Sequence, residues 1–442
     1  MSTFYLQQFG CRATQADGAA IERQLLDRGC SSVQTPDAAD YVIVNTCTVT
    51  SAADSQARDA IRKIHARNPA ARIIVTGCYA QRAPEDLAAL PGVSHVVGNS
   101  HKPEIPGLIP QRTSYSPASP ESTFIASSDI QPAVGFRKIL IGDIFAQSEV
   151  LVAPVFGGEA NHTRPTLKIQ DGCNSRCAFC VIPFVRGKSR SLPPDRVLDE
   201  LRRLSASGFR EIVLSGINLG TWGRDLLPRM EFIHLLRRIL DETPVERLRI
   251  SSIEPLDVTQ DLVELFAAND RLAQHFHMPL QSGSDRILGA MHRWYRIEHY
   301  ARRVELIHAL LPHAAIGADV IAGFPGETED DHAATLAFIE RLPFTYLHVF
   351  SYSQRPGTRA ASLPDQVPPQ TIKRRARELR ALGESKSAAF RRSQNGRALR
   401  VLALHRSERD VQVGVTPALS SNYLSVRIPG AIEFNQWIDA RM

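Results

Sequence analysis

Three cysteines form a C-x3-C-x2-C motif near the middle of the chain, at Cys173, Cys177 and Cys180. Three thiolates on one short loop can bind one metal centre and leave its fourth coordination position open, which is how a metal centre recruits a substrate. Zinc is the alternative, but a closed zinc site needs a fourth Cys or His. The nearest upstream is His162, and none occurs in the fifty residues after Cys180. An iron-sulfur cluster fits this motif better than zinc.

Three further cysteines are dispersed but regularly placed, at Cys11, Cys47 and Cys78. They are separated by 36 and 31 residues, about one strand-helix unit each, and each follows an expected strand and one turn-type residue. Buried free cysteines that act as small hydrophobic residues are the alternative. Because all three come at strand exits, a second open iron-sulfur site is the functional interpretation. Cys30 has no such placement and is expected to be an ordinary thiol.

The first hundred residues alternate between expected strands and helices. Apolar runs at residues 3–8, 41–45 and 72–76 have the length of strands, and a helical pattern follows each one. This alternation predicts a parallel, doubly wound α/β sheet. The carboxyl ends of such strands converge on the crevice where open α/β folds bind ligands, so the fold would gather the three dispersed thiols.

A second strand-helix region is expected after residues rich in Ser and Pro at 113–128. Strands are predicted at 165–170, 210–214, 247–252, 314–321 and 345–350, with helices at 194–206, 230–240 and 369–392. This size suits a full or partial (β/α) barrel, whose chemistry collects at the carboxyl ends of the strands. Short strands at 398–404, 410–415 and 423–428 predict a small β-barrel. We therefore expect domains at 1–112, 159–390 and 391–442, with a linker at 113–158.

Composition excludes several classes. The chain has 442 residues, 43% hydrophobic and 22% charged, which is typical of globular proteins and not of disordered, collagenous or coiled-coil ones. Seven cysteines are too few for a disulfide scaffold. The chain has no apolar run of about 18 residues and no secretory signal pattern, so a cytoplasmic location without a membrane partner is expected.

Positive charge is concentrated near the carboxyl end. Residues 371–400 hold ten Lys or Arg and two Glu, a net charge of +8 in a chain whose total is +6. Such a stretch is either a solvated helix face or a surface for a polyanion, most simply nucleic acid.

The motifs together resemble a known family. Residues 173–180 (CNSRCAFC) look like the signature loop of radical S-adenosylmethionine enzymes. With residues 45–50 (NTCTVT) and 77–81 (GCYAQ), they resemble the methylthiotransferase family of that superfamily. Similar stretches occur at 182–187, 215–220, 279–284, 323–328 and 352–358. The end of the chain, with Asn422-Tyr423, resembles the OB-like, RNA-binding TRAM module.

The resemblance implies cofactors and a reaction. Cys173, Cys177 and Cys180 would hold a [4Fe-4S] cluster that binds and cleaves S-adenosyl-L-methionine, with an electron donor such as flavodoxin or ferredoxin. The three dispersed cysteines would hold an auxiliary [4Fe-4S] cluster that carries the sulfur. Members of the family transfer a methylthio group to an unactivated C–H carbon. No catalytic side chain separate from the cluster ligands is expected.

The family divides by substrate. Residues 166–174 (TLKIQDGCN) and 220–223 (GTWG) look most like the branch that adds a 2-methylthio group to N6-threonylcarbamoyladenosine next to the tRNA anticodon. The partner would be a tRNA anticodon stem-loop. The same chemistry on N6-isopentenyladenosine or on a ribosomal-protein aspartate is an alternative, and a non-catalytic iron-sulfur RNA-binding protein is an alternative of another class. Residues 355–358 (RPGT) and the basic helix favour RNA over a protein substrate.

Further side chains are candidates for binding. Four residues near expected strand exits are predicted to contact S-adenosylmethionine, or else to be structural: Gly216, Asn218, Glu254 and Gln281. Four arginines suit phosphate or carboxylate groups: Arg186, Arg190, Arg293 and Arg355. Four aromatic residues suit base stacking, with core packing as the alternative: Trp294, Tyr295, Tyr352 and Tyr423. Asp319 falls inside an apolar strand, and Thr14 replaces an amide that the family usually has after Cys11.

Overall fold

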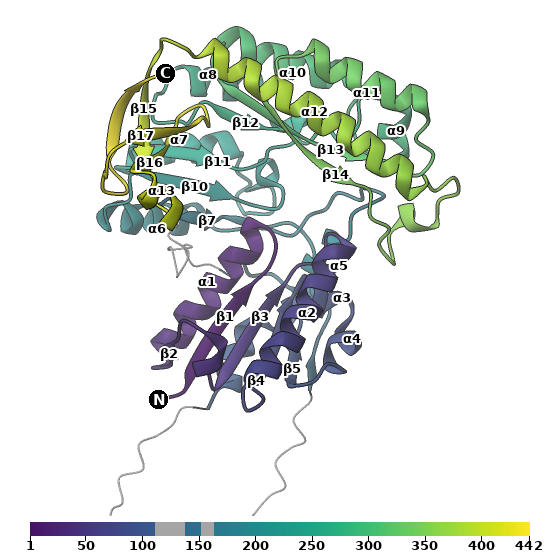
Figure 1. The fold of residues 1–442 in the computed structure, drawn as a ribbon, viewed down its shortest axis with the longest axis vertical. Helices are drawn as coiled ribbons and strands as arrows, with labels where there is room; N and C mark the ends of the chain where they lie inside the picture. Colours follow the sequence, from purple (N-terminus) through teal and green to yellow (C-terminus); the bar gives the residue numbers. More distant parts are fainter. Residues whose placement is uncertain (111–137, 152–162) are drawn as a thin grey trace, which may run out of the picture. The chain divides into compact units, whose positions relative to one another are not determined.

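The computed structural model describes residues 1–110, 138–151 and 163–442, which form two compact units (Figure 1). Unit 1 is Met1–Gln147 with Phe184–Arg186, and unit 2 is Ser148–Pro183 with Gly187–Met442. Most of the predicted linker, residues 113–137 and 152–158, lies outside the described residues. Within its range, Ile139–Leu140 forms strand β6 of the unit 1 sheet.

Unit 1 is a parallel six-stranded sheet with the order β2-β1-β3-β4-β5-β6. Its strands are β1 (Thr3–Gln8), β2 (Ser31–Ser32), β3 (Tyr41–Thr46), β4 (Arg72–Gly77), β5 (Val93–Val97) and β6. Helices are α1 (Arg12–Asp27), α2 (Ser51–Arg67), α3 (Cys78–Arg82) and α4 (Pro84–Ala88). The predicted doubly wound sheet is confirmed. The strand order reverses at β1, because β2 lies on one side of it and β3 on the other. Open α/β folds bind ligands at such a switch point.

The central strands of unit 1 are apolar on both faces because both faces are covered. Every residue of β3 is buried. Val42 and Val75 pack against Ile61 and Ile64 of α2. The hydroxyl oxygen of Thr50 caps α2 by accepting a hydrogen bond from the Ala53 amide. The packing holds the carboxyl ends of the strands in fixed positions.

Unit 2 contains a partial barrel of six parallel strands surrounded by helices. Its strands are β7 (Thr166–Lys168), β10 (Glu211–Ser215), β11 (Arg247–Ile250), β12 (His275–His277), β13 (Ala315–Ala322) and β14 (Tyr346–Ser351). Bridges between Leu248 and Leu272 and between Ser252 and His277 join the β11 and β12 edges. The helices include α6 (Pro194–Ala206), α7 (Phe232–Glu242), α8 (Gln260–Ala267), α9 (Asp285–Ala290), α10 (Ile297–Leu310) and α11 (Glu329–Arg341). The predicted partial (β/α) barrel is confirmed; the short strand β12 was not predicted.

Alternation along each strand divides the barrel into an apolar outer layer and a polar interior. Leu248 and Ile250 of β11 belong to the core beneath the helices. Arg247 and Arg249 point the other way, into the barrel, and are buried. The same alternation in β13 places Asp319 on the inner face, between Ala318 and Val320 of the core.

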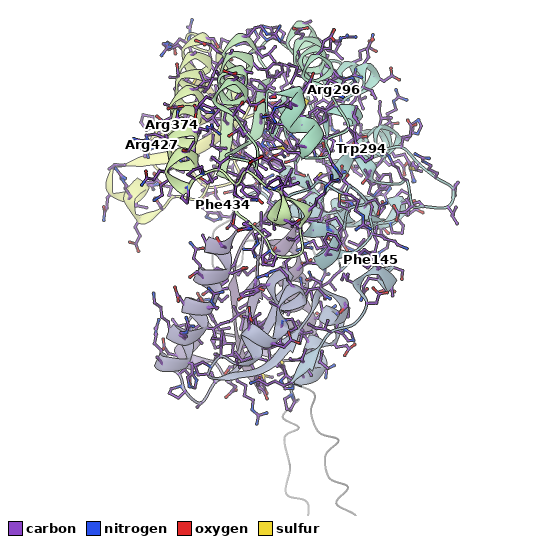
Figure 2. All side chains as sticks on the ribbon, turned by 90° about the vertical axis from the view of Figure 1, so that its right-hand side faces the viewer. Phe145, Trp294, Arg296, Arg374, Arg427 and Phe434 are labelled. Atoms are coloured by element: carbon purple, nitrogen blue, oxygen red, sulfur yellow. The ribbon has the colours of Figure 1, made fainter. Side chains whose placement is uncertain are left out.

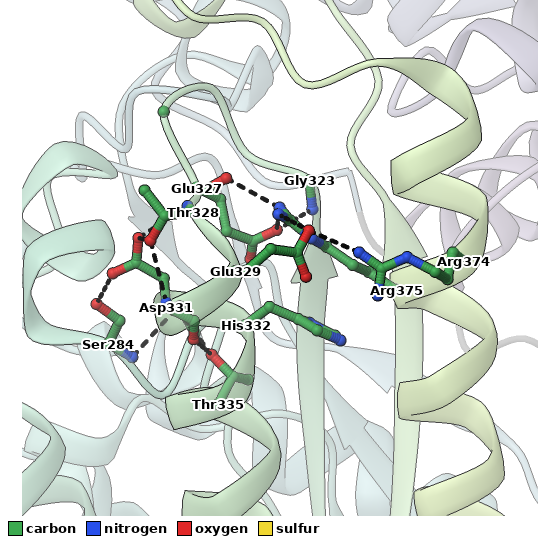
Figure 3. Close-up of polar contacts among 12 residues, drawn as sticks. Ser284, Gly323, Glu327, Thr328, Glu329, Asp331, His332, Thr335, Arg374 and Arg375 are labelled. Atoms are coloured by element: carbon green, nitrogen blue, oxygen red, sulfur yellow. Dashed lines mark hydrogen bonds and ion pairs between the residues drawn. The ribbon is translucent and has the colours of Figure 1, made fainter.

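Helix α12 (Pro369–Ser393) is held against the barrel by ion pairs rather than left as a free basic face (Figure 3). Buried Arg375 donates to the carboxylates of Glu327 at 2.7 Å and Glu329 at 2.8 Å. Arg374 pairs with Glu329 as well. The first turn of α11 is closed by a reciprocal cap between Thr328 and Asp331.

The chain ends in a curled, antiparallel four-stranded sheet with the order β17-β16-β15-β18. Its strands are β15 (Ala398–Ala403), β16 (Val415–Ser420), β17 (Ser425–Pro429) and β18 (Trp437–Arg441). The strand predicted at 410–415 is wrong, because α13 (Glu408–Gln412) and a turn at 413–414 precede β16, which begins at Val415. Ser407 and Asp410 cap each other through side chain and backbone, which favours a helical turn over extended backbone.

Candidate functional site

The C-x3-C-x2-C loop follows β8 (Gln170–Asp171) in unit 2 and is clamped by backbone hydrogen bonds. The Cys173 amide donates to Gly187 O at 3.1 Å, and the Cys180 amide donates to Cys177 O at 3.1 Å. Between them, the Ala178 amide donates to Met291 O at 2.9 Å. All three cysteines are free and half-buried. These backbone hydrogen bonds fix the loop that carries the three thiols.

Burial, together with repulsion between the thiolates, favours a cation beside this loop. Burial, and to a smaller extent the nearby Cys177 and Cys173, together raise the pKa of Cys180 to about 12. Burial also raises the pKa of Cys177, against the lowering effect of Arg293. Three thiolates in this space need positive charge beside them, and an iron-sulfur cluster supplies it. The donor set fits a [4Fe-4S] cluster with one iron left for a substrate.

Arg293 links the cysteine loop to the acidic side chain of Glu254. Its Nη1 donates to Cys177 Sγ at 3.3 Å, and its Nη2 pairs with the Glu254 carboxylate. Its Nε donates to the Tyr295 hydroxyl at 3.3 Å. Sequence reasoning assigned Arg293 to phosphate or carboxylate and did not foresee the thiol contact, because Cys177 and Arg293 are 116 residues apart.

A cavity of about 680 Å³ opens beside this loop, entirely within unit 2. Its lining includes Asn174, Asn218, Glu254, Arg293 and Trp294. Trp294 stands at the surface with 74% of its area exposed (Figure 2). The cavity is large enough for a nucleoside cofactor, and two of the four residues predicted to contact S-adenosylmethionine line it.

Asn218 has the clearest mark of a missing ligand. Its backbone amide donates to Gln170 Oε1 at 2.8 Å. Its Oδ1 is buried and has no hydrogen-bond partner among the described residues. A buried amide oxygen without a donor is costly. An ammonium or hydroxyl group of a bound ligand would satisfy it.

The other two predicted contacts lie outside the lining of this cavity. A Cβ on Gly216 would lie 2.9 Å from Gln170 Oε1, so glycine allows the close packing there. Gln281 is buried with φ of 67°, and its amide donates to Asp319 O at 2.8 Å. The contact of Gly216 and Gln281 with S-adenosylmethionine stays a prediction.

In unit 1, Cys11, Cys47 and Cys78 follow the ends of β1, β3 and β4. Glycines bring these ends close. Gly10 has φ of 101°, and a Cβ there would lie 2.5 Å from Cys47 Cβ. Gly77 has φ of 102°, and its Cβ would lie 2.3 Å from Thr46 O. An L side chain at either position would push the strand ends apart.

The three unit 1 thiols also act on one another. Burial, and to a smaller extent Cys78 and Cys11, together raise the pKa of Cys47 to about 12. Cys47 and Cys78 are buried, whereas Cys11 is exposed. As in unit 2, three free thiols at one site fit a [4Fe-4S] cluster with an open position. Cys30 is buried and belongs to no such group in the described residues.

Of the charged residues behind these thiols, the sequence analysis noted Arg186 as suited to a phosphate or carboxylate but missed Asp17 and Lys102. Asp17 accepts from Lys102 Nζ at 2.5 Å and from Arg186 Nη2 at 3.0 Å, and all three side chains are buried. Arg186 Nη2 also lies 3.4 Å from Thr14 Oγ1, which lies 3.6 Å from Cys11 Sγ. Thr14 therefore connects the cysteine to the cations, although it replaces the amide usual in the family.

The other predicted ligand-binding side chains mostly lie in packed surroundings, and their role in binding stays a prediction. Arg190 is buried and donates to Glu149 O at 3.2 Å. Arg355 is buried. Tyr352 packs edge-on against Phe324, with ring centroids 5.8 Å apart. Tyr423 stacks on His275 with ring centroids 4.3 Å apart, and its ring also lies 5.6 Å from that of Tyr346.

The basic stretch splits into a buried and an exposed part. Arg375 is buried in its ion pairs, so it is not available to a polyanion. Six other basic residues of residues 371–400 remain exposed: Lys373, Arg377, Arg380, Arg391, Arg392 and Arg400. Among the described residues, no helix is both long enough and apolar enough to cross a membrane.

Comparisons with known proteins agree with this geometry. Residues 167–339 match the model of the radical SAM superfamily, and residues 3–98 match that of the uncharacterized protein family UPF0004. A solved structure of the radical S-adenosylmethionine methyltransferase TsrM from Kitasatospora setae, with cobalamin and a [4Fe-4S] cluster bound, has a similar fold. Its TM-score is 0.55 at 17% identity, covering 82% of this chain and 77% of that one. The fold and the three-thiol loop define a radical S-adenosylmethionine enzyme.

Proteins of similar sequence narrow this class to one family. The threonylcarbamoyladenosine tRNA methylthiotransferase MtaB of Aquifex aeolicus is 34% identical, covering 98% of both chains. MtaB of Bacillus subtilis is 34% identical, covering 97% of this chain and 91% of that protein. The tRNA-2-methylthio-N(6)-dimethylallyladenosine synthase of Syntrophobacter fumaroxidans is 34% identical over 86% of this chain and 79% of that protein. The chain belongs to the methylthiotransferase family of radical S-adenosylmethionine enzymes, whose cofactors are S-adenosylmethionine and [4Fe-4S] clusters.

Proposed function

We propose that this protein adds a 2-methylthio group to N6-threonylcarbamoyladenosine next to the anticodon of tRNA. The observation that carries the proposal is the pair of three-thiol sites, one in each unit, in a chain that matches two MtaB proteins over nearly its whole length. When bound, the clusters and S-adenosylmethionine supply a 5′-deoxyadenosyl radical and the sulfur that is transferred.

The protein's own residues hold and orient these groups in the proposal. Cys173, Cys177 and Cys180 hold the cluster that cleaves S-adenosylmethionine. Arg293 donates to Cys177 Sγ and so offsets the negative charge that forms when the thiol ionises. Asn218 Oδ1, buried and without a partner among the described residues, accepts from a polar group of the cofactor.

Unit 1 has the sulfur-donor role in the proposal. Cys11, Cys47 and Cys78 hold the auxiliary cluster. Lys102 and Arg186 place two positive charges against the single carboxylate of Asp17. The positive charge of Arg186 favours the Cys47 thiolate by lowering the pKa of Cys47, against the larger raising effect of burial.

RNA recognition is assigned to the end of the chain. The exposed basic residues of α12 and the curled sheet, which we propose is a TRAM-like module, contact tRNA phosphates. Because the substrate is tRNA, the reaction belongs to the cytoplasm. A flavodoxin- or ferredoxin-type donor supplies the electrons.

Two cysteine variants test this assignment in anaerobically reconstituted full-length protein. Cys177→Ala should abolish 5′-deoxyadenosine formation. Cys47→Ala should still form 5′-deoxyadenosine but make no methylthiolated nucleoside. Cys30→Ala is the matched control, since Cys30 is buried outside both sites, and it should retain both activities.

The substrate is tested by nucleoside mass spectrometry. Wild-type protein is offered tRNA with N6-threonylcarbamoyladenosine and tRNA with N6-isopentenyladenosine in the same reaction. The proposal expects 2-methylthio product from the first tRNA. Product from the second alone would replace the substrate assignment, and methylthiolation by the Cys47 variant would overturn the sulfur-donor role. Failure of wild-type protein to form 5′-deoxyadenosine would favour a non-catalytic RNA-binding protein.

A further inference from the structure

Three neighbouring strands of the barrel bring two imidazoles and a carboxylate together on its inner face. His277 Nε2 lies 3.2 Å from Asp319 Oδ1, and His348 Nδ1 lies 3.3 Å from the same oxygen. The Ser252 hydroxyl fixes the far side of the His277 ring at 2.7 Å from Nδ1. We name these three residues the inner-face triad: His277, Asp319 and His348. Sequence analysis noted only Asp319 and gave it no partner.

The triad lies beside the cavity of the cysteine loop. Ser252, which holds His277, is two residues before Glu254, and Glu254 lines that cavity. Burial is the main cause that raises the pKa of Glu254, and the negative charge of Asp319 raises it further. The two carboxylates are therefore within electrostatic range of each other. No triad residue lines the cavity itself, so Ser252 and Glu254 are the link between the two, and a ligand reaches the triad by extending beyond that lining.

The triad is buried at one end and open at the other. His277 is 8% exposed and Asp319 21%, whereas 54% of the His348 side chain is accessible. His348 is on β14, the edge strand of its sheet. Two residues further along the same strand, and so on the same face, Phe350 is 43% exposed. An exposed aromatic ring beside an open imidazole is a suitable surface for a base that carries a polar substituent.

We infer that the inner-face triad binds the threonylcarbamoyl group of the substrate adenosine, and that His348 is the residue that selects it over an apolar N6 group. This inference rests on the proposed function. The threonylcarbamoyl group carries a carboxylate, a hydroxyl and urea N–H groups. Both ring nitrogens of His277 face partners within the protein, and Nδ1 of His348 faces Asp319, so Nε2–H of His348 donates to the carboxylate of the ligand. Asp319 accepts from the hydroxyl or the urea.

An isopentenyl group would match this surface poorly. It has no polar atom, so it would cover the triad without replacing the hydrogen bonds that water makes to it. Leaving buried polar groups unpaired is what allows a hydrogen-bonding site to reject an apolar analogue. Phe350 stacks on the adenine ring in either case, so it contributes affinity without discrimination.

Binding of anticodon stem-loops tests the role of His348. Three RNAs that differ only at N6 of the target adenosine, carrying threonylcarbamoyl, isopentenyl or hydrogen, are titrated into full-length cluster-loaded protein by fluorescence anisotropy. His348→Ala should weaken binding of the threonylcarbamoyl RNA roughly tenfold to hundredfold, the usual effect of losing a hydrogen bond to a charged group. Binding of the other two RNAs should stay unchanged.

Matched variants separate a loss of N6-group recognition from a general loss of folding or RNA binding. His308→Ala removes an exposed histidine of α10 and should leave all three affinities unchanged. His348→Asn keeps a side-chain donor and should restore part of the preference. Phe350→Leu should weaken all three RNAs by a similar factor.

The results distinguish a failure of this inference from a failure of the proposed function. If wild-type protein methylthiolates the threonylcarbamoyl RNA but His348→Ala keeps the wild-type preference, the inference is wrong and the proposed function stands. If wild-type protein modifies only the isopentenyl RNA, the proposed function itself fails. If EDTA abolishes the preference and Zn²⁺ restores it, the triad is a metal site instead, and the inference is overturned.

Discussion

The barrel floor of unit 2 depends on one carboxylate, that of Glu211. Glu211 is completely buried, and its oxygens lie 2.7 Å from Arg247 Nε, 2.8 Å from Arg249 Nε and 3.1 Å from Arg164 Nη1. Arg249 also donates to Ser420 O at 3.0 Å, so the same network ties the carboxyl-terminal sheet to the barrel. Burial alone would raise the pKa of Glu211, but the three guanidiniums outweigh it and lower the pKa to about 2.

Replacing Glu211 with Gln keeps the shape and removes the charge. A carboxyl pKa lowered from 4.5 to about 2 corresponds to about 3 kcal/mol of stabilisation. Loss of one partner in a buried ion network costs about 3–5 kcal/mol, because the remaining charges are left buried. We therefore expect Glu211→Gln to lower the free energy of unfolding of unit 2 by about 3–5 kcal/mol at pH 7.

The pH dependence has a definite sign. Because the pKa of Glu211 is lower in the folded protein, its stabilisation is fully present above pH 4.5 and is lost as the pH falls toward 2. The gap between wild type and Glu211→Gln should thus be constant from pH 7 to pH 5 and should begin to narrow below 4.5.

Urea unfolding followed by tryptophan fluorescence measures this gap. The chain has three tryptophans, Trp222, Trp294 and Trp437, and all three belong to unit 2, so the signal reports that unit alone. Glu298→Gln is the control, since it breaks only an exposed ion pair with Arg302 and should cost less than about 1 kcal/mol. A Glu211→Gln variant as stable as this control, or a gap that changes between pH 7 and pH 5, would refute the reasoning.

Two predictions concern the thiol site of unit 1. Asp17→Asn leaves the buried Lys102 and Arg186 without their carboxylate, so it should destabilise unit 1 by about 3–5 kcal/mol, measured by amide exchange of β1 and β3 peptides. Gly10→Ala forces a Cβ to within 2.5 Å of Cys47 Cβ at φ of 101°. It should lower the iron bound after reconstitution from two clusters to one, measured by iron content and electron paramagnetic resonance.

Matched controls exist for both changes. Asp37→Asn breaks an exposed pair with Arg67 and should leave amide exchange in β1 and β3 unchanged. Gly29→Ala also alters a glycine with positive φ, but nothing lies within 4 Å of its Cβ, so it should cost backbone strain of about 1–2 kcal/mol and spare the iron content. Full iron binding by Gly10→Ala would show that the strand ends need not approach closely.

Local patterns predicted the regular elements that place the cysteines. The helix predicted at 194–206 coincides with α6, and the strand predicted at 3–8 coincides with β1. Apolar period and helix-capping residues are properties of neighbouring residues, so they can be read along the chain. The strand predicted at 410–415 from the alternating pattern is wrong, because the reciprocal cap between Ser407 and Asp410 starts a helix there instead.

Elements with little local signal were missed. Strand β12 has three residues, His275–His277, of which two are polar. It forms because parallel pairing with β13 satisfies its backbone and because Phe276 enters the core. Its two polar residues face the inside of the barrel. A buried parallel strand is usually recognised by a continuous apolar run, which β12 does not have.

By itself, the sequence determined the two α/β regions, the placement of cysteines at strand exits and the family. Those features come from local periodicity and from motifs of a few residues. Only the tertiary structure decided which charges meet: Asp17 and Arg186 are 169 residues apart, and His277 and His348 are brought together by two strand pairings. A buried charge is stable only beside a partner supplied by the fold, and such partners leave no periodic trace along the chain.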